Sequence, residues 1–406
     1  MPGGQDSGDG VTNPPRARDL GIAIGTGTPG PYNAITDVDG VRVGHTTLIS
    51  GVGPLVVGNG PVRTGVTVIV THDGDVWAEP LFAGAATMNG NGELTGLEWV
   101  REAGLLTGAI GITNTNAVGT VRDALVSSAS ASHDPSAVYW CLPVAGETYD
   151  GSLNDIAGGH VRPEHVAAAL AAARGGRVAE GNIGGGTGMV CHEFKGGIGT
   201  ASRRLPAELG GWTVGVLVQA NYGRRGLLRI DGVPVGEEIP LDEVPSPHSR
   251  IRHVVGDDTG EGGPSQAGTR DRGPGAGSII GIVATDAPLL PHQCARLARR
   301  APLGVARVGG LGSTTSGDMF LAFATGNRGM PPTEADPAGN GALELRGLVD
   351  RALDPLFEAT VEATEEAIVN ALVAAETMTG RDGITAHRLP HDRLVEVMER
   401  HGRLRG

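Results

Sequence analysis

The stretch DDTGEGGPSQAGTRDRGPGAGSIIGIVATDAP, residues 257–288, changes character abruptly between Gly277 and Ser278. Its first part, together with Gly256, contains no Val, Ile, Leu, Met or aromatic residue and so has little apolar surface to offset the entropy of ordering. Its last part is almost entirely apolar and rich in β-branched residues, which is typical of a strand buried on both faces. We therefore predict a flexible linker over 256–277 that leads directly into a buried strand over 278–287.

The serine at this junction has two interpretations. Ser278 is either simply the first residue of the strand, which is the commoner case, or it is an N-terminal nucleophile. In the second case its Oγ attacks the carbonyl of Gly277, and hydrolysis of the resulting ester frees Ser278 as a new chain terminus. The new α-amino group, with a pKa of about 7.7–8.0 in model peptides, then acts as the base for the hydroxyl. This chemistry needs no His, and the sequence has no GxSxG motif.

Composition limits the class of protein. With 406 residues the chain is long enough for one large domain or two ordinary ones. The net charge of -13 disfavours binding to a phosphate backbone, so we expect no nucleic-acid partner. The 68 glycines are roughly 17% of the chain against about 7% in average proteins, and they have no three-residue period. They indicate tight turns and closely packed sheets and helices.

The pattern of apolar residues predicts a mixed α+β fold in which sheets pack on each other with helices outside. Runs rich in β-branched residues predict strands over 64–71, 108–115, 212–221, 278–287 and 318–327. Helices are predicted over 92–104, 116–129, 162–176, 291–301 and about 355–378. In the third of these, Pro163 suits a first turn and Gly175 suits the stop.

Several kinds of site are not indicated. Cys141, Cys191 and Cys294 are far apart, which disfavours a disulfide framework or a zinc site. His192 is not followed by a second His at helical spacing, so a metal site is not expected. The glycine clusters between 180 and 202 lack GK[ST] and favour turns over phosphate binding. Without a long apolar run or a secretion signal, we expect no membrane partner, a disordered tail over 1–16 and a cytoplasmic protein.

Polar side chains gather at the ends of apolar runs. Each of them is individually more often a turn residue, but together they supply a carboxylate, a phenol, an amide and a hydroxyl where strands end. They are Glu147, Tyr149, Asn221, Ser316 and Asp318.

The sequence resembles the L-aminopeptidase/D-Ala-esterase/amidase family, which includes the β-peptidyl aminopeptidases. The likeness spans nearly the whole chain and rests on stretches such as TNTNAVGTVRDAL, GETYDGSLND, EGNIGGGTGM, VQANYG and GSIIGIVATDAPLLPHQ. The resemblance implies a four-layer αββα sandwich with two packed sheets flanked by helices. It also implies self-cleavage into an α chain, 17–277, and a β chain, 278–406, of a single domain, assembled as a tetramer of αβ units.

The resemblance assigns roles to the residues around the cut. Ser278 stands at the position of the nucleophile, and Gly277 is then the last residue of the α chain. Asn221 matches the amide of the oxyanion hole, and Tyr149 matches a tyrosine near the nucleophile.

Further roles follow for the acidic residues. Glu147 matches the acid that receives the free amine of the substrate. Ser316 and Asp318 match a hydroxyl–carboxylate pair that bonds toward the nucleophile, with Asp318 standing where some relatives carry the longer Glu.

These observations together predict a self-processing serine aminopeptidase that needs no cofactor or metal. Its substrates would be short peptides, amides or esters with a free amine. Two alternatives are an acyltransferase like the ornithine acetyltransferases and an endo-acting hydrolase of amide oligomers. A binding protein that never cleaves itself is a further possibility.

Overall fold

The computed structural model describes residues 14–136, 139–248, 277–332 and 340–405. The predicted linker over 256–277 lies outside these residues except for Gly277, and the predicted tail over 1–16 lies outside them up to residue 13. Arg16, at the end of that tail, is 9% exposed and forms an ion pair with Glu180. The folded part of the chain therefore includes at least this residue of the predicted tail.

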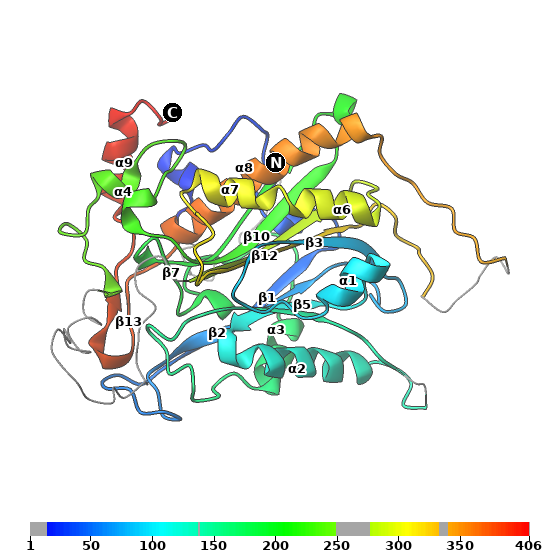
Figure 1. Cartoon of the computed structure of the whole chain (residues 1–406), viewed down its shortest axis with the longest axis horizontal. Helices are drawn as coiled ribbons and strands as arrows, with labels where there is room; N and C mark the ends of the chain where they lie inside the picture. Colours follow the sequence, from blue (N-terminus) through cyan, green and yellow to red (C-terminus); the bar gives the residue numbers. More distant parts are fainter. Residues whose placement is uncertain (1–13, 137–138, 249–276, 333–339, 406) are drawn as a thin grey trace, which may run out of the picture.

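Two β-sheets form the centre of the molecule (Figure 1). The larger sheet has the strand order β4 (Leu105–Leu106), β3 (Leu81–Gly90), β12 (Gly317–Ala324), β11 (Ser278–Thr285), β10 (Thr213–Asn221) and β9 (Gly197–Arg204). The smaller sheet has the order β1 (Arg42–Ser50), β2 (Val62–Val70), β5 (Ile110–Asn114) and β6 (Val144–Thr148). Within these two sheets, β11 pairs with β12 and β5 with β6 in parallel, and the other pairs are antiparallel.

Two short hairpins and eight helices complete the regular α and β structure of the described residues. The hairpins are β7 (Val190–Cys191) with β8 (Phe194–Lys195), and β13 (Met378–Thr379) with β14 (Thr385–Ala386). The helices are α1 (Leu97–Ala103), α2 (Val118–Ser130), α3 (Pro163–Ala171), α4 (Val235–Glu238), α6 (Pro291–Ala298), α7 (Ala301–Arg307), α8 (Asp354–Val373) and α9 (His391–Arg400).

Helices lie against the outer face of each sheet (Figure 1). Helix α8 packs on β9 and β10, and α6 packs on β3, while α2 and α3 pack on strands of the smaller sheet. A buried apolar cluster between the two sheets contains Ile280 and Ile282 of β11 together with Ile110 and Ile112 of β5. These contacts confirm the predicted α+β class.

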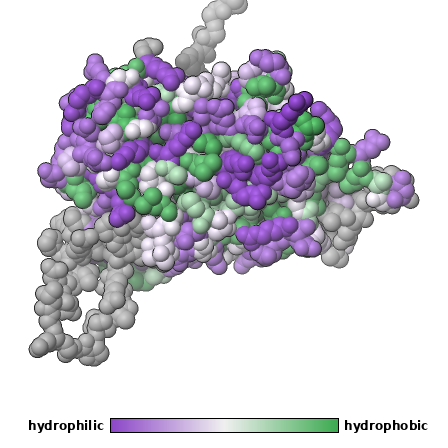
Figure 2. All heavy atoms as spheres, turned by 45° about the horizontal axis from the view of Figure 1, so that its top comes forward, coloured by the Kyte–Doolittle hydropathy of each residue, from purple (hydrophilic) through white to green (hydrophobic). Residues whose placement is uncertain are grey.

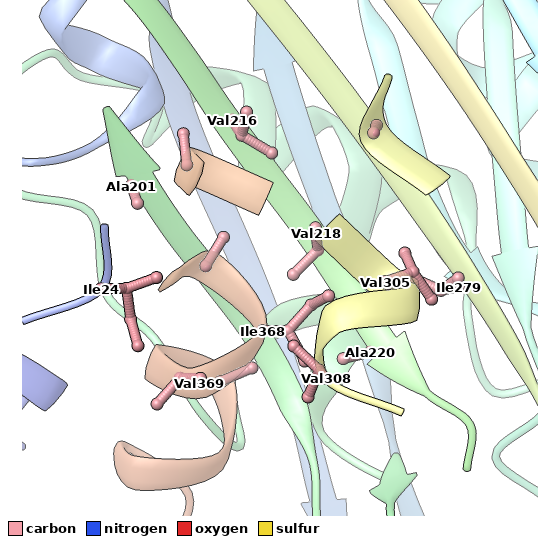
Figure 3. Close-up of a cluster of buried hydrophobic side chains, with 14 of the residues drawn as sticks. Ile24, Ala201, Val216, Val218, Ala220, Ile279, Val305, Val308, Ile368 and Val369 are labelled. Atoms are coloured by element: carbon pink, nitrogen blue, oxygen red, sulfur yellow. The ribbon is translucent and has the colours of Figure 1, made fainter. Parts of the chain in front are cut away.

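A second core lies between the larger sheet and its helices. Figure 3 shows Ile368 of α8 near Val218 of β10, with Val305 of α7 close by. Strands of the larger sheet are thus buried on both faces, which explains why β11 is a nearly continuous apolar run.

Glycine within strands allows helices to approach the sheet closely. A Cβ added at Gly199 of β9 would lie 1.9 Å from the carbonyl oxygen of Ala367 in α8. A Cβ added at Gly84 of β3 would lie 2.2 Å from the backbone nitrogen of Ala295 in α6. The high glycine content therefore reflects close packing of helices on sheets, as the composition indicated.

The secondary structure predicted from the sequence is largely confirmed. The five predicted strands correspond to β2, β5, β10, β11 and β12, and the five predicted helices correspond to α1, α2, α3, α6 and α8. One predicted helix, 291–301, ends at Ala298, and a new helix, α7, begins at Ala301 with Pro302 in its first turn. Proline lacks an N–H and is suited to a helix start, which explains the break.

The surface mixes polar and apolar side chains. On the face shown in Figure 2, hydrophobic side chains lie in small groups among hydrophilic ones. None of the helices in the described ranges is both long enough and apolar enough to cross a lipid bilayer.

Candidate active site

Ser278 lies at the first position of β11, at the edge of the larger sheet where β11 and β12 begin and β10 ends. It is directly opposite Asn221 of β10 in the antiparallel pair and opposite Gly317 of β12 in the parallel pair. Its side chain is on the same face as Ile280, which belongs to the cluster between the two sheets. The backbone N–H of Gly317 donates to Ser278 Oγ at 3.1 Å. The predicted nucleophile is therefore 2% exposed and fixed by a specific donor.

The residue before it must be glycine for steric reasons. A Cβ added at Gly277 would lie 1.9 Å from the carbonyl oxygen of Asn221. The carbonyl oxygen of Gly277 accepts a hydrogen bond from the N–H of Gly317 at 3.2 Å. The same N–H thus lies beside both the hydroxyl of Ser278 and the carbonyl that this hydroxyl would attack.

The amide of Asn221 has a defined orientation. Its Oδ1 accepts from the backbone N–H of Val190 at 2.7 Å, and its Nδ2 donates to the carbonyl oxygen of Tyr149 at 2.8 Å. Because Oδ1 faces a donor and Nδ2 faces an acceptor, the amide cannot be reversed without losing both bonds. Tyr149 directly follows β6, and its ring lies over Gly151, where an added Cβ would be 2.5 Å from the phenol oxygen.

The hairpin that carries Val190 is fixed by a buried lysine. Lys195 is fully buried, and its Nζ donates to the carbonyl oxygens of Met189 and Gly196, each at 2.7 Å. Burial lowers the pKa of Lys195 to about 7. This contact secures the segment from which Asn221 receives its hydrogen bond.

Ser316 and Asp318 form a buried pair next to the nucleophile. Ser316 Oγ donates to Asp318 Oδ1 at 2.6 Å, and each residue is 2% exposed. Burial raises the pKa of Asp318 to about 6, although the bond from Ser316 and one from the backbone of Ile279 both oppose the rise. The carboxylate therefore contacts the backbone of the residue that follows Ser278.

Glu147 lies near the end of β6 and is 2% exposed. Its Oε1 accepts from the backbone N–H of Glu93 at 3.0 Å, and its Oε2 accepts from the hydroxyl of Thr115. A Cβ added at Gly92 would lie 2.8 Å from Glu147 Oε1 and 3.2 Å from the Cα of Gly317. The carboxylate is thus close to the strand end that holds Ser278.

The structure therefore brings all the predicted site residues to one end of the two sheets, and it adds groups that sequence reasoning missed. The most important is the N–H of Gly317, which leaves no side-chain signal. Asn89 is a second: its Nδ2 donates to the carbonyl oxygens of Ser313 and Ser316. Asn91 Nδ2 donates to that of Thr315 at 2.7 Å. These two asparagines stand in the stretch MNGNGE, whose paired Asn–Gly steps could have marked it as a turn near the site.

The residues considered for other sites have structural contacts. His192 is fully buried, burial lowers its pKa to about 4, and its Nδ1 lies 3.1 Å from the carbonyl oxygen of Arg224. In the described ranges, no group of three or more His, Cys, Asp or Glu side chains gathers as for a metal. Cys141, Cys191 and Cys294 are free and buried, as predicted.

A family model described as peptidase family S58 matches residues 33–386. The chain belongs to this family. S58 membership confirms the resemblance stated from the sequence, and the chain is an aminopeptidase of the N-terminal-nucleophile type. The comparisons do not favour the acyltransferase alternative.

Two relatives are each described as the β-peptidyl aminopeptidase BapA. The one from Sphingosinicella microcystinivorans is 47% identical over 392 residues, covering 96% of this chain and 93% of the relative. The one from Sphingosinicella xenopeptidilytica is 45% identical over 391 residues, covering 95% and 91%.

Solved structures show the same fold. A β-aminopeptidase of a Burkholderia species superposes with a TM-score of 0.83 at 52% identity, covering 95% of this chain and 99% of that one. The L-aminopeptidase D-Ala-esterase/amidase of Ochrobactrum anthropi gives a TM-score of 0.83 at 41% identity, covering 96% and 100%. The latter is described as a prototype of the serine aminopeptidases with a variant of the Ntn hydrolase fold.

Proposed function

We propose that the chain cleaves its own Gly277–Ser278 bond and that the freed Ser278 is the nucleophile of a serine aminopeptidase. One observation carries this proposal: the N–H of Gly317 lies 3.1 Å from Ser278 Oγ and 3.2 Å from the carbonyl oxygen of Gly277. A donor at this place can stabilise the negative charge that develops on the carbonyl oxygen under attack.

The self-cleavage has two steps. Ser278 Oγ adds to the carbonyl carbon of Gly277 while its proton passes to the departing nitrogen of Ser278. The C–N bond breaks, leaving an ester to Oγ and a free α-amine. Water then hydrolyses the ester, which produces a carboxylate at Gly277 and the free hydroxyl of Ser278. No group outside the chain and water is required.

Hydrolysis of the substrate repeats this chemistry. The α-amine of Ser278 accepts the proton of its own Oγ as the hydroxyl attacks the first carbonyl of the substrate, and it returns that proton to the leaving amine. Asn221 Nδ2 and the N–H of Gly317 donate to the developing oxyanion. Water completes the cycle by hydrolysing the ester on Oγ. Ser316 and Asp318 position the amine, and Tyr149 holds Asn221 through its backbone carbonyl.

Glu147 selects substrates with a free amino end. Its carboxylate is held by Glu93 and Thr115 close to Gly317, and a carboxylate at this place pairs with a substrate ammonium. We therefore infer that the substrates are short peptides, amides or esters with a free amine. The relatives described as β-peptidyl aminopeptidases make β-amino acids candidates for the first residue.

Several finer features belong to this proposal. The helices that lie against the outer faces of two facing sheets support a four-layer αββα sandwich. The division into an α chain over 17–277 and a β chain over 278–406 follows from the cut. A tetramer of αβ units, a cytoplasmic location and independence from cofactors stay predictions from the sequence.

The test is the variant Ser278→Ala, compared with Ser127→Ala on the exposed face of α2 as a control. The wild-type protein and the control should give two bands on a denaturing gel and hydrolyse aminoacyl p-nitroanilides. The Ser278→Ala variant should give one band near 41.3 kDa and be inactive. A cut, active Ser278→Ala variant would contradict the proposal. An endo-acting hydrolase would instead release internal fragments from an amide oligomer.

A further inference from the structure

A pocket of about 540 Å³ opens beside the site residues. Its volume is within the usual range for small-molecule sites, which is about 300–1,000 Å³. Its apolar lining comes from Leu94, Leu97, Trp99, Leu142 and Met319. None of these side chains has a role in the chemistry proposed above, so the pocket needs its own explanation.

The pocket is connected to the nucleophile through β12. Met319 lies two residues after Gly317, so both are on the same face of the strand and about 7 Å apart along it. In the parallel pair, Gly317 is opposite Ser278 and Met319 is opposite Ile280. The apolar wall formed by Met319 therefore begins one side-chain position away from the donor to Ser278 Oγ.

The pocket is also connected to Glu147. Gly92 and Glu93 line it, and the backbone N–H of Glu93 donates to Glu147 Oε1 at 3.0 Å. The next lining residue, Leu94, forms a β-bridge with Gly146, directly before Glu147. One wall of the pocket therefore continues the segment that holds the proposed amine-binding carboxylate.

We propose that this pocket receives the side chain of the substrate's first residue and favours apolar side chains. The inference rests on the proposed function, because it requires the ammonium at Glu147 and the scissile carbonyl at Ser278. The first residue is the only part of the substrate that lies between these two groups. Its side chain is therefore next to the pocket, whereas the leaving part extends beyond Ser278.

The charges at the pocket narrow the class of side chain. Glu93 and Glu98 contribute carboxylates, while Arg101 contributes one guanidinium that is paired with Glu98 at 2.5 Å. Glu147 is matched by the substrate's ammonium and Glu98 by Arg101, so the carboxylate of Glu93 leaves the pocket lining with a net negative charge. An acidic side chain would meet repulsion here, so the pocket selects neutral apolar side chains against acidic ones.

The experiment uses two dipeptides with the same composition, Leu-Ala and Ala-Leu, in whichever backbone series the wild-type protein hydrolyses fastest. The variant Leu142→Trp fills the pocket from a half-buried position outside the proposed machinery. The matched control is Leu303→Trp, at a residue on α7 that is 53% exposed. Self-cleavage and hydrolysis of Ala-Ala report whether each variant folds.

We expect Leu142→Trp to lower kcat/KM for Leu-Ala by about tenfold or more, while values for Ala-Leu and Ala-Ala stay within about twofold. Leu142→Ala, which widens the pocket, should move the ratio of Leu-Ala to Ala-Leu in the opposite direction. The control Leu303→Trp should leave kcat/KM for all three dipeptides unchanged.

Three results would overturn the inference. If Ala-Leu loses activity and Leu-Ala does not, the pocket holds the second residue. If all three dipeptides change equally or not at all in both variants of Leu142, the pocket does not select the side chain. If the wild-type protein cuts no dipeptide with a free amine in any series, the proposed function itself fails and the inference with it.

Discussion

The backbone N–H of Gly317 contacts both Ser278 Oγ and, across the bond to be cut, the carbonyl oxygen of Gly277. This arrangement follows from register, because Gly317 is directly opposite Ser278 in the parallel pair of β11 and β12. A backbone donor is rigid and lacks rotamers, so it is organised before the reaction begins. The same donor then serves self-cleavage and substrate hydrolysis, since both attack a carbonyl from Ser278 Oγ.

The amide of Asn221 provides a first prediction. Asn221→Ala should lower kcat by about 100- to 1000-fold with little change in KM, since it removes a donor that acts in the transition state. Steady-state kinetics on the cleaved fraction measures this, and self-cleavage should slow as well. Asn182→Ala, which removes an amide bonded to the backbone of Glu376 and not to a site residue, should leave kcat unchanged. An unchanged kcat in Asn221→Ala would remove this residue from the mechanism.

Glu147 separates substrate binding from self-cleavage. Glu147→Gln keeps the shape and the oxygen acceptor but removes the negative charge, so kcat/KM for free-amine substrates should fall at least about tenfold, the effect of roughly 1.4 kcal/mol. Self-cleavage binds no ammonium and should proceed to completion on a gel. A variant that loses both processes equally would show that the carboxylate has a structural role instead.

The pH dependence depends on Asp318, whose pKa burial raises to about 6. Above this pH the group is ionised and accepts from Ser316, and below it the proton removes the charge beside the nucleophile. The α-amine of Ser278 must also be neutral. As the pH is lowered below the pKa of this amine, the logarithm of kcat/KM should therefore fall with a slope of one down to about pH 6 and with a slope of two below it. Asp318→Asn should retain only the single slope and have a lower maximum. Identical slopes in both proteins would exclude this role.

Breaking a buried ion network under α8 should be strongly destabilising. Arg203 is 1% exposed, and it contacts Glu362 at 2.9 Å and Glu366 at 2.7 Å. Arg203→Met leaves two buried carboxylates without this cation and should reduce the free energy of unfolding by about 3–5 kcal/mol in urea titrations at pH 7. Arg388→Met breaks only an exposed pair with Glu376 and should cost at most about 1 kcal/mol.

The loss of stability caused by Arg203→Met should diminish in acid. Burial alone would raise the pKa of Glu366, but the bond from Arg18 and the charge of Arg203 hold it below its usual value. A lowered pKa contributes stability above the ordinary pKa of the group, and this contribution disappears as the pH falls through the lowered value. The difference between wild type and Arg203→Met should therefore be larger at pH 7 than at pH 3.

Much of the fold could be predicted from the sequence where one local pattern dominates. The strand at Ser278 was predictable because apolar, β-branched residues follow directly on a stretch with none. Strands β3 and β9 were missed because small residues such as Gly84 and Gly199 lower the β signal, and their purpose lies in helices distant in sequence. No local pattern reveals that contact.

The candidate site was likewise only partly predictable from the sequence. Glu147, Asn221 and Asp318 carry side chains that can be recognised, so the sequence pointed to them, with the family resemblance assigning their roles. The N–H of Gly317 was not predictable, because any residue has one and only the register of β11 with β12 makes it functional. The N–H of Val190, which orients Asn221, was hidden for the same reason.

Self-cleavage before Ser278 is tested by the intact mass of the purified protein together with sequencing of its N-termini. We expect two chains that stay associated, with the second beginning Ser-Ile-Ile-Gly at Ser278, and activity that appears as the cut proceeds. A single unbroken chain of 41.3 kDa that hydrolyses free-amine substrates at full rate would contradict it, since Ser278 would then have no α-amine to act as its base.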